Sequence, residues 1–285
     1  MITIKEHNRV VHYFPELADF LECVHPDKAS KVRGVFQREV NQWDGGLTYT
    51  QSYDLCATGQ AADVEMIELR DALTTDIRLA KSQSSYWDVA GGGAIDVGAH
   101  LQGIPECMLE FNEEVGKARR TISLLVSVDA NSAASAEQMR LRGAANMALI
   151  DALESSGLYK INIYGTWATR SSPQSWHGII RIKEAGHHYD PNAIAFVMSN
   201  PAFLRRLVFG YQDLMLLEMS EAFRCNARHA YGRPEEVITL PNEIDYNCVD
   251  LSEPLNGMDI PFYSKEGAIK WVKSKLNKYG VGMEG

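Results

Sequence analysis

The sequence lacks the features that mark secreted, membrane-spanning and zinc-binding proteins. No apolar run approaches the roughly 18 to 20 residues that a membrane-spanning helix needs, and the first residues lack the apolar segment of a signal peptide. The five cysteines are odd in number and include no CxxC pair, so neither a disulfide framework nor a zinc site is predicted. We therefore expect a cytoplasmic protein with reduced thiols.

Positive charge is also scarce. The chain has 28 Lys and Arg against 37 Asp and Glu, which gives a formal net charge of −9. An acidic protein repels the phosphate backbone, so bulk binding of nucleic acid is not expected, and nothing in the sequence predicts a membrane contact. The hydrophobic content of 45% is enough for a substantial globular core.

Motifs of catalysis and of cofactor binding are missing as well. No serine lies in a Gly-x-Ser-x-Gly context. The run Gly91–Gly93 does not continue into GxGxxG, because Asp96 stands where the third glycine would be. Catalytic triads are assembled in space, so an enzyme is not excluded. We assign no catalytic residue, no metal ligand and no cofactor.

The clearest positive signal lies at residues 121–168. A branched, apolar run at 121–129 predicts a strand that ends in Asp129. Ser135 and Gln138 then fit a capping box, and apolar residues at three- and four-residue steps predict a helix over 135–156. A second strand follows at 159–167. A helix of this length between two strands implies a right-handed crossover, so we predict that the two strands are adjacent and parallel.

Alternating strands and helices continue downstream, which is typical of α/β proteins. Upstream, short amphipathic segments predict that residues 1–80 are mainly helical. Residues 82–103 are predicted to form a long structured loop with apolar anchors at Trp87, Val97 and Leu101. We predict a three-layer α/β fold with a largely parallel sheet. The remaining elements expected are strands at 178–183 and 236–240, helices at 191–200 and 201–221, and a last helix that Ser264 caps and Gly280 ends. The expected division is a mainly helical region at 1–115 and an α/β domain at 116–285.

The segment 121–168 contains, in order, a strand ending in an acid, a polar turn, a capped helix that contains Arg142-Gly143-Ala144-Ala145, and a second strand. This order of parts resembles the opening of a von Willebrand factor A domain, a Rossmann-like fold. In that family the turn reads Asp-x-Ser-x-Ser. Here the acid, Asp129, is kept, Asn131 replaces the first serine and Ala133 the second. Because magnesium needs a full set of hard oxygen ligands, the resemblance implies a degenerate metal site with no bound ion.

A second resemblance rests on an ordered series of short motifs. It is to a family of uncharacterised bacteriophage proteins, spans residues 45–210 and implies a viral source without any chemistry. The motifs are Trp87-Asp88-Val89-Ala90-Gly91, the run at 97–108, Arg142-Gly143-Ala144-Ala145 and Pro201-x-x-x-Arg205-Arg206.

Polar residues near these motifs are the candidates for contact with a partner or for a degenerate metal site. The turn residues have a simpler alternative role as caps of the following helix, and the arginines have an alternative role in ion pairs with the protein's own acidic surface. A His187-His188 pair with Asp190 resembles a metal cluster only superficially, because adjacent side chains of an extended segment point in opposite directions. The candidates are Asp129, Asn131, Ser132, Asp96, Arg205 and Arg206.

These features predict a non-catalytic adaptor that binds a host or viral protein, and the A-domain resemblance favours an AAA-type ATPase by analogy. One alternative is a metal-dependent hydrolase or nucleic-acid-processing enzyme built on Asp129 and Asp96, and another is a structural component of a virion. An enzyme would need several acids in one cleft, whereas a binding module would need exposed apolar surface beside the Asp129 turn.

Overall fold

The structure of the chain is a computed structural model. It describes residues 1–6, 8–32, 34–59, 64–76, 85–88, 94–95, 100–102, 107–111, 120–155, 159–171, 174–187, 191–215, 233–234, 248–251, 255 and 260–278.

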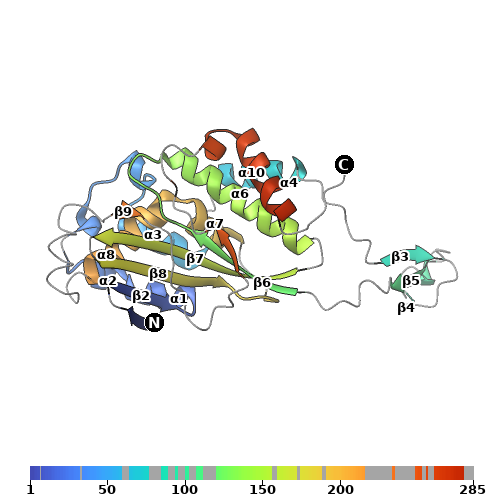
Figure 1. Ribbon diagram of the computed structural model, residues 1–285, viewed down its shortest axis with the longest axis horizontal. Helices are drawn as coiled ribbons and strands as arrows, with labels where there is room; N and C mark the ends of the chain where they lie inside the picture. Colours follow the sequence, from blue (N-terminus) through green and yellow to red (C-terminus); the bar gives the residue numbers. More distant parts are fainter. Residues whose placement is uncertain are drawn as a thin grey trace.

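The protein is built on a mixed β-sheet (Figure 1). Within the described residues it has seven strands in the order β1-β2-β8-β7-β6-β10, and β9 pairs with β7 beside this path. The parallel pairs are β2 with β8, β6 with β7 and β6 with β10, and the antiparallel pairs are β1 with β2, β7 with β8 and β7 with β9. The strands are β1 (Ile2–Glu6), β2 (Arg9–Phe14), β6 (Arg120–Ser127), β7 (Tyr159–Ser171), β8 (Gln174–Lys183), β9 (Arg233–Pro234) and β10 (Cys248–Leu251).

The predicted βαβ unit is confirmed. Strands β6 and β7 are parallel neighbours, in register from the pair Arg120 and Tyr159 to the pair Ser127 and Thr166. Helix α6 (Ala136–Ser155) connects them. The expectation of a largely parallel sheet is wrong, however, because β8 follows β7 after only two residues and is antiparallel to it. Such a short connection cannot carry a crossover.

The prediction of a mainly helical N-terminal region is wrong for residues 2–14. These residues form β1 and β2, and β2 joins the main sheet beside β8. Both Val11 and Phe14 are fully buried. A strand that is buried on both faces shows no alternation of apolar and polar residues, so its sequence gives no periodic signal.

Helices follow the hairpin, and their core is shared with the later part of the chain. The ring of Phe20 packs against Trp167 of β7 and against Tyr211, and Tyr49 belongs to the same buried cluster. Packing therefore crosses the boundary that we expected near residue 115. The elements are α1 (Leu17–Cys23), α2 (Pro26–Ala29), α3 (Tyr49–Thr58) and α4 (Val64–Asp76), with short 3-10 helices η1 (Val35–Gln37) and η2 (Gln42–Asp44).

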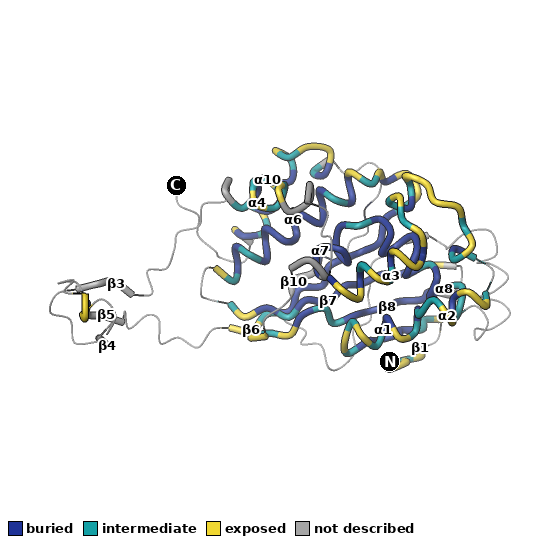
Figure 2. Tube along the Cα trace, turned by 180° about the vertical axis from the view of Figure 1, so that it is seen from behind, coloured by how far each residue is buried: buried dark blue, intermediate teal, exposed yellow. Residues whose placement is uncertain are grey.

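Helix α6 is the central helix of the layer above the sheet, and it is buried along most of its length (Figure 2). It packs against α4, α7 and α10. The contact with α7 is close, because a Cβ atom at Gly143 would stand 2.3 Å from the Cβ of Ser199. The other helices are α7 (Pro191–Ser199), the π-helix η4 (Phe203–Val208), α8 (Phe209–Met215), the 3-10 helix η5 (Ile260–Tyr263) and α10 (Lys265–Lys278).

Caps at the helix starts agree with the sequence. The backbone N–H of Gly267 donates to Ser264 Oγ at 3.1 Å, which confirms Ser264 as the cap of the last helix. Of the described helices, none has the length and apolar content to cross a membrane.

A second, three-stranded antiparallel sheet has the order β3-β5-β4. Two of its strands lie where a loop was expected, and Leu101, an expected apolar anchor, is 80% exposed. The strands are β3 (Ser85–Asp88), β4 (Ala94–Ile95) and β5 (Met108–Phe111). The side chain of Trp87, together with Asp96, Val97, Gly280 and the strand predicted at 236–240, lies outside the described residues.

Candidate functional site

Asp129, the acid at the end of β6, is turned into the protein. It is 4% exposed, and its Oδ2 accepts a short hydrogen bond from the backbone N–H of Ala168 on β7. Its carbonyl oxygen accepts from Arg142 Nη1 at 2.7 Å and from the N–H of Leu255 at 3.0 Å. Its own N–H donates to Ser127 Oγ at 3.0 Å. The residue therefore joins β6, β7, α6 and the segment after β10.

The turn that follows Asp129 is closed by side-chain caps. Asn131 Oδ1 accepts from the N–H groups of Ala133 and Ala134 at 2.9 and 3.1 Å. The predicted capping box is confirmed, because Gln138 N–H donates to Ser135 Oγ at 3.1 Å and Ser135 N–H donates to Gln138 Oε1 at 3.0 Å. The turn thus has the capping role that was the alternative to a metal site.

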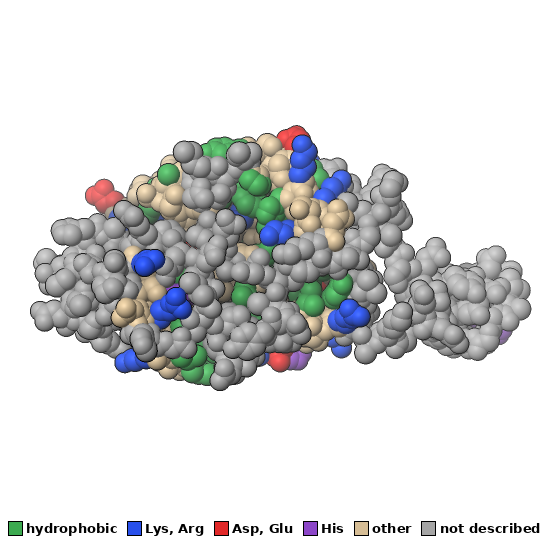
Figure 3. Space-filling model, viewed as in Figure 1, with side chains coloured by type: hydrophobic (Ala, Val, Ile, Leu, Met, Phe, Trp, Pro, Cys, Tyr) green, Lys and Arg blue, Asp and Glu red, His purple; other side chains and the backbone are tan. Residues whose placement is uncertain are grey.

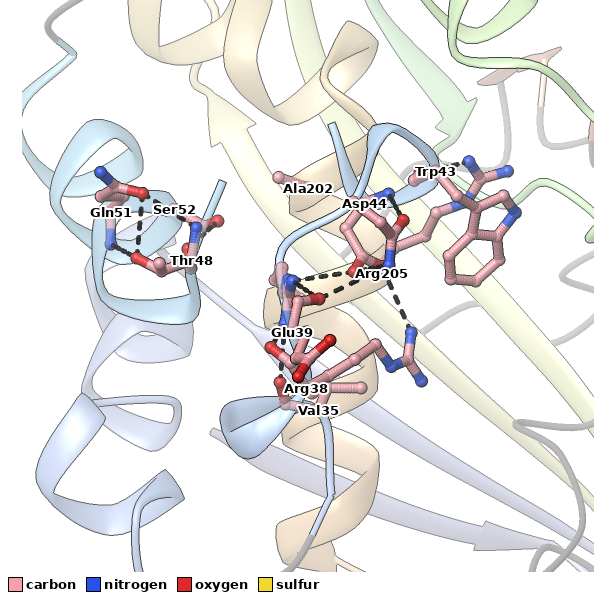
Figure 4. A network of polar contacts seen from close by, with 12 residues as sticks. Val35, Arg38, Glu39, Trp43, Asp44, Thr48, Gln51, Ser52, Ala202 and Arg205 are labelled. Atoms are coloured by element: carbon pink, nitrogen blue, oxygen red, sulfur yellow. Dashed lines mark hydrogen bonds and ion pairs between the residues drawn. The ribbon is translucent and has the colours of Figure 1, made fainter. Parts of the chain in front are cut away.

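Arg205 lies in the π-helix and is buried, with 1% exposure. Its Nη1 donates to the carbonyl of Trp43 at 2.6 Å, and its Nη2 donates to the carbonyl of Ala134 at 2.8 Å. Its guanidinium carbon stands 4.1 Å from the centre of the Trp43 ring. Figure 4 shows the side chains of Arg205 and Trp43 next to each other. Burial lowers the pKa of Arg205 to about 10, and the nearby Asp44 carboxylate raises it in part. One side chain therefore ties segment 35–44 to the Asp129 turn.

Arg206 is fully buried and binds the other end of the same segment. Its guanidinium donates to the carbonyls of Val35, Arg38 and Glu39, each at 2.9 Å, and pairs with Asp44 Oδ2 at 2.8 Å. The Asp44 carboxylate is fully buried and also accepts from Arg38 Nη1 at 3.2 Å. A guanidinium in this position is not available to a partner at the surface, so both arginines position the segment instead of forming an outer contact.

The surface left beside the Asp129 turn is partly apolar. Trp43 is partly exposed, and its Nε1 donates to the carbonyl of Ser132 at 3.3 Å. Val40, which precedes Trp43 by three residues in segment 35–44, is 47% exposed, and the side chains of Ser132 and Ala133 are exposed. We call Val40, Trp43, Ser132 and Ala133 the Trp43 surface. One signal for this surface is present in the sequence, because Trp43 lies inside the turn-rich run Asn41–Gly46, which has no helical or strand periodicity that would bury it.

Acidic and metal-binding residues do not gather in the described part of the chain. Among these residues, no group of three or more His, Cys, Asp or Glu side chains has the placement to hold a metal ion. Asp96, His188 and Asp190 lie outside them. His187 is exposed, with Nδ1 3.3 Å from a carboxylate oxygen of Glu184.

The thiols that the structure describes are free. They belong to Cys23, Cys56 and Cys107, and burial raises the pKa of the first two. A raised thiol pKa disfavours the reactive thiolate.

Comparison with curated proteins and with solved structures finds no match. Neither comparison shows a link to bacteriophage proteins or to von Willebrand factor A domains. One family model matches residues 2–255, nearly the whole chain, so the protein belongs to the family described as Domain of unknown function (DUF7192).

Proposed function

We propose that this protein is a non-catalytic adaptor that binds a protein partner through the Trp43 surface. The observation that carries the proposal is the fixed position of Trp43, which Arg205 holds from one side and the Ser132 carbonyl holds at the indole N–H. An aromatic ring that is already ordered loses little entropy on binding, and tryptophan is enriched among residues that dominate binding energy.

The place of this surface in the fold supports the same proposal. It lies beside the carboxyl end of β6, an edge where open α/β sheets commonly bind ligands. The segment whose sequence resembles an A domain lies next to this surface. It comprises β6, Asp129, α6 and β7. By that analogy a host or viral protein, with an AAA-type ATPase as a specific case, is the partner to test.

The state of the nearby acids favours binding over catalysis. A general acid or base must reach a substrate proton, and Asp129 and Asp44 are both buried in hydrogen bonds within the chain. Around them, the exposed side chains of the Trp43 surface are neutral, and Arg38, which pairs with Asp44, is partly exposed beside the Trp43 ring. Apolar surface beside the Asp129 turn is the property that distinguishes a binding module from an enzyme.

The test compares two single substitutions of exposed apolar residues. Val40→Asp places a charge on the Trp43 surface, and Leu101→Asp places the same charge on an exposed leucine elsewhere. The tagged proteins are used to capture partners from cells that express the protein, and a captured protein is then purified and titrated against each variant. We expect Val40→Asp to weaken the affinity at least tenfold, since truncating or charging a central contact costs more than about 1.4 kcal/mol, and Leu101→Asp to bind like the parent.

Two results would contradict the proposal. One is a purified partner that binds Val40→Asp as tightly as the parent. The other is turnover of a substrate that Asp129→Asn abolishes while the fold stays intact, which would favour the alternative of a hydrolytic enzyme.

A further inference from the structure

Strand β1 is at the end of the main sheet, and among the described strands only β2 pairs with it. It lies at the lower margin of the molecule in Figure 2. Met1 is 50% exposed and Ile2 is 39% exposed. Figure 3 shows hydrophobic side chains at the margin where Figure 1 places the N-terminus. An edge strand with exposed apolar residues is a template for pairing with another strand.

The register of the hairpin fixes which backbone groups face outward. Glu6 pairs with Arg9 across a two-residue connection, and such a connection joins a hydrogen-bonded pair. Hydrogen-bonded and non-hydrogen-bonded pairs alternate along an antiparallel ladder. Ile4 and Ile2 therefore bond to β2, while the N–H and C=O groups of Thr3 and Lys5 point to the open edge.

We propose that the open edge of β1 pairs antiparallel with β1 of a second copy of this chain. The pairing is centred on Thr3, which stands opposite the Thr3 of the other copy in a hydrogen-bonded pair. The two-fold axis then places Ile2 opposite the second Ile4, in the pair type whose side chains are closest. Each Lys5 stands opposite Met1 and away from the other Lys5.

The side-chain pattern of β1 favours a second copy over an unrelated strand. Ile4 packs against the buried cluster of Val11, Tyr13 and Ile179 on one face of the sheet, and Ile2 is on the same face, two residues away. Pairing Ile2 with Ile4 of the other copy extends that apolar face across the two-fold axis and covers the exposed part of Ile2. The interface is isologous and closes after two copies.

The contact is small, and this sets the expected strength. Two short strands bury less than the roughly 1,200 Å² that separates weak from stable interfaces, so the dimer should dissociate on dilution. The pairing uses none of the residues of the Trp43 surface, so a test of the dimer does not depend on whether the proposed function is correct.

The experiment is analytical ultracentrifugation of the full chain over about two decades of concentration, with Thr3→Pro and its matched control Thr3→Val. Proline removes the N–H that faces the open edge and leaves the bonds of Ile2 and Ile4 to β2 in place. Valine keeps that N–H. We expect a reversible dimer for the parent and for Thr3→Val, and a dissociation constant at least about tenfold higher for Thr3→Pro, with circular dichroism showing that the variant is folded.

Hydrogen exchange locates the contact. The amides of Thr3 and Lys5 should become protected as the concentration of the parent rises, while the amide of Ile4 is protected at every concentration. A parent that stays monomeric throughout the range overturns the proposal, including the case in which β1 accepts a strand of another protein. A dimer that Thr3→Pro leaves unchanged, or one without protection at Thr3, overturns it as well. If Thr3→Pro is unfolded, Ile2→Lys provides the second variant, and it must weaken the dimer for the proposal to stand.

Discussion

Acid should destabilise this protein through His12, a buried histidine on β2. The ring is 6% exposed, and its Nδ1 lies 2.6 Å from the hydroxyl oxygen of Tyr211. Trp176 Nε1 donates to the same nitrogen at 3.3 Å. Because an indole N–H can only donate, Nδ1 acts as an acceptor and the imidazole is neutral. Burial, and to a smaller extent the positive charge of Lys5, lower the pKa of His12 from 6.5 to about 4.

The sign and size follow from proton linkage. The unfolded chain binds a proton at His12 near pH 6.5, whereas the folded protein does so only near pH 4, so acidification favours the unfolded state between these values. The full difference corresponds to about 3 kcal/mol, and about 2 kcal/mol of it is lost between pH 7 and pH 5. Well above pH 6.5 His12 is neutral in both states and contributes no pH dependence.

The measurement is urea unfolding of the parent and of His12→Gln at pH 7 and pH 5. Glutamine keeps an acceptor oxygen near Tyr211 and Trp176 and does not titrate. Other groups titrate in both proteins alike, so the difference between the two pH dependences isolates His12. We expect the parent to lose about 2 kcal/mol more than His12→Gln on going to pH 5. Equal losses in the two proteins would refute the reasoning, because they would mean that His12 has the same pKa in the folded and unfolded states.

Two further substitutions test the packing of the core and of segment 35–44. Gly178→Ala should destabilise the protein by up to about 3 kcal/mol in thermal or urea unfolding, because its Cβ would stand 1.9 Å from a ring atom of the buried Trp167. The double variant with Trp167→Phe should recover part of this loss. Purely additive losses would show that the two residues do not compete for space. Arg206→Met should lower the free energy of unfolding by about 3 to 5 kcal/mol, because it leaves the buried Asp44 carboxylate without its closest cation. Adding Asp44→Asn should reduce this loss. An unchanged stability of Arg206→Met would contradict the role of this ion pair.

Local signals in the sequence were sufficient for the βαβ unit. The strand before Asp129, the capping box of Ser135 and Gln138 and the apolar stripe of α6 all involve residues close together in the chain. Their geometry depends on helix and strand periodicity alone, and a helical connection permits only parallel strands. This is why the parallel pairing of β6 with β7 agrees with the prediction.

The remaining strands depend on partners far away in the sequence. The sequence of β2 is short and shows no alternation of apolar and polar residues, and it becomes a strand because β8, more than 150 residues later, offers a parallel neighbour. For β8 itself the sequence predicted a strand in a largely parallel sheet, and the two-residue connection to β7 makes its pairing with β7 antiparallel instead. Neither fact follows from periodicity.

The two arginines show the same limit at the candidate site. In a regular α-helix adjacent side chains diverge by about 100°, which favoured ion pairs of Arg205 and Arg206 with the protein's own acidic surface over a shared binding site. In the structure both lie in a π-helix, a rare form that is common at functional positions, and both bind segment 35–44. The acceptors are mostly backbone carbonyls. Every residue has a backbone carbonyl, so the residue types of segment 35–44 do not predict that Arg205 and Arg206 bind it.

This arrangement explains how a loop can present an ordered aromatic ring. Segment 35–44 has only 3-10 turns of its own, and its position comes from two buried cations that reach it from η4 and from the buried Asp44 between them. Arg205 also binds the carbonyl of Ala134, so the segment and the Asp129 turn are held by one side chain. The interior of the site is therefore ionic, and its outer side chains include the charged Arg38 and Glu39 as well as Val40, Trp43 and Ser132. This arrangement supports the proposed recognition of another surface, because the Asp44 and Asp129 carboxylates are already bonded within the chain and the ordered Trp43 ring is left partly exposed.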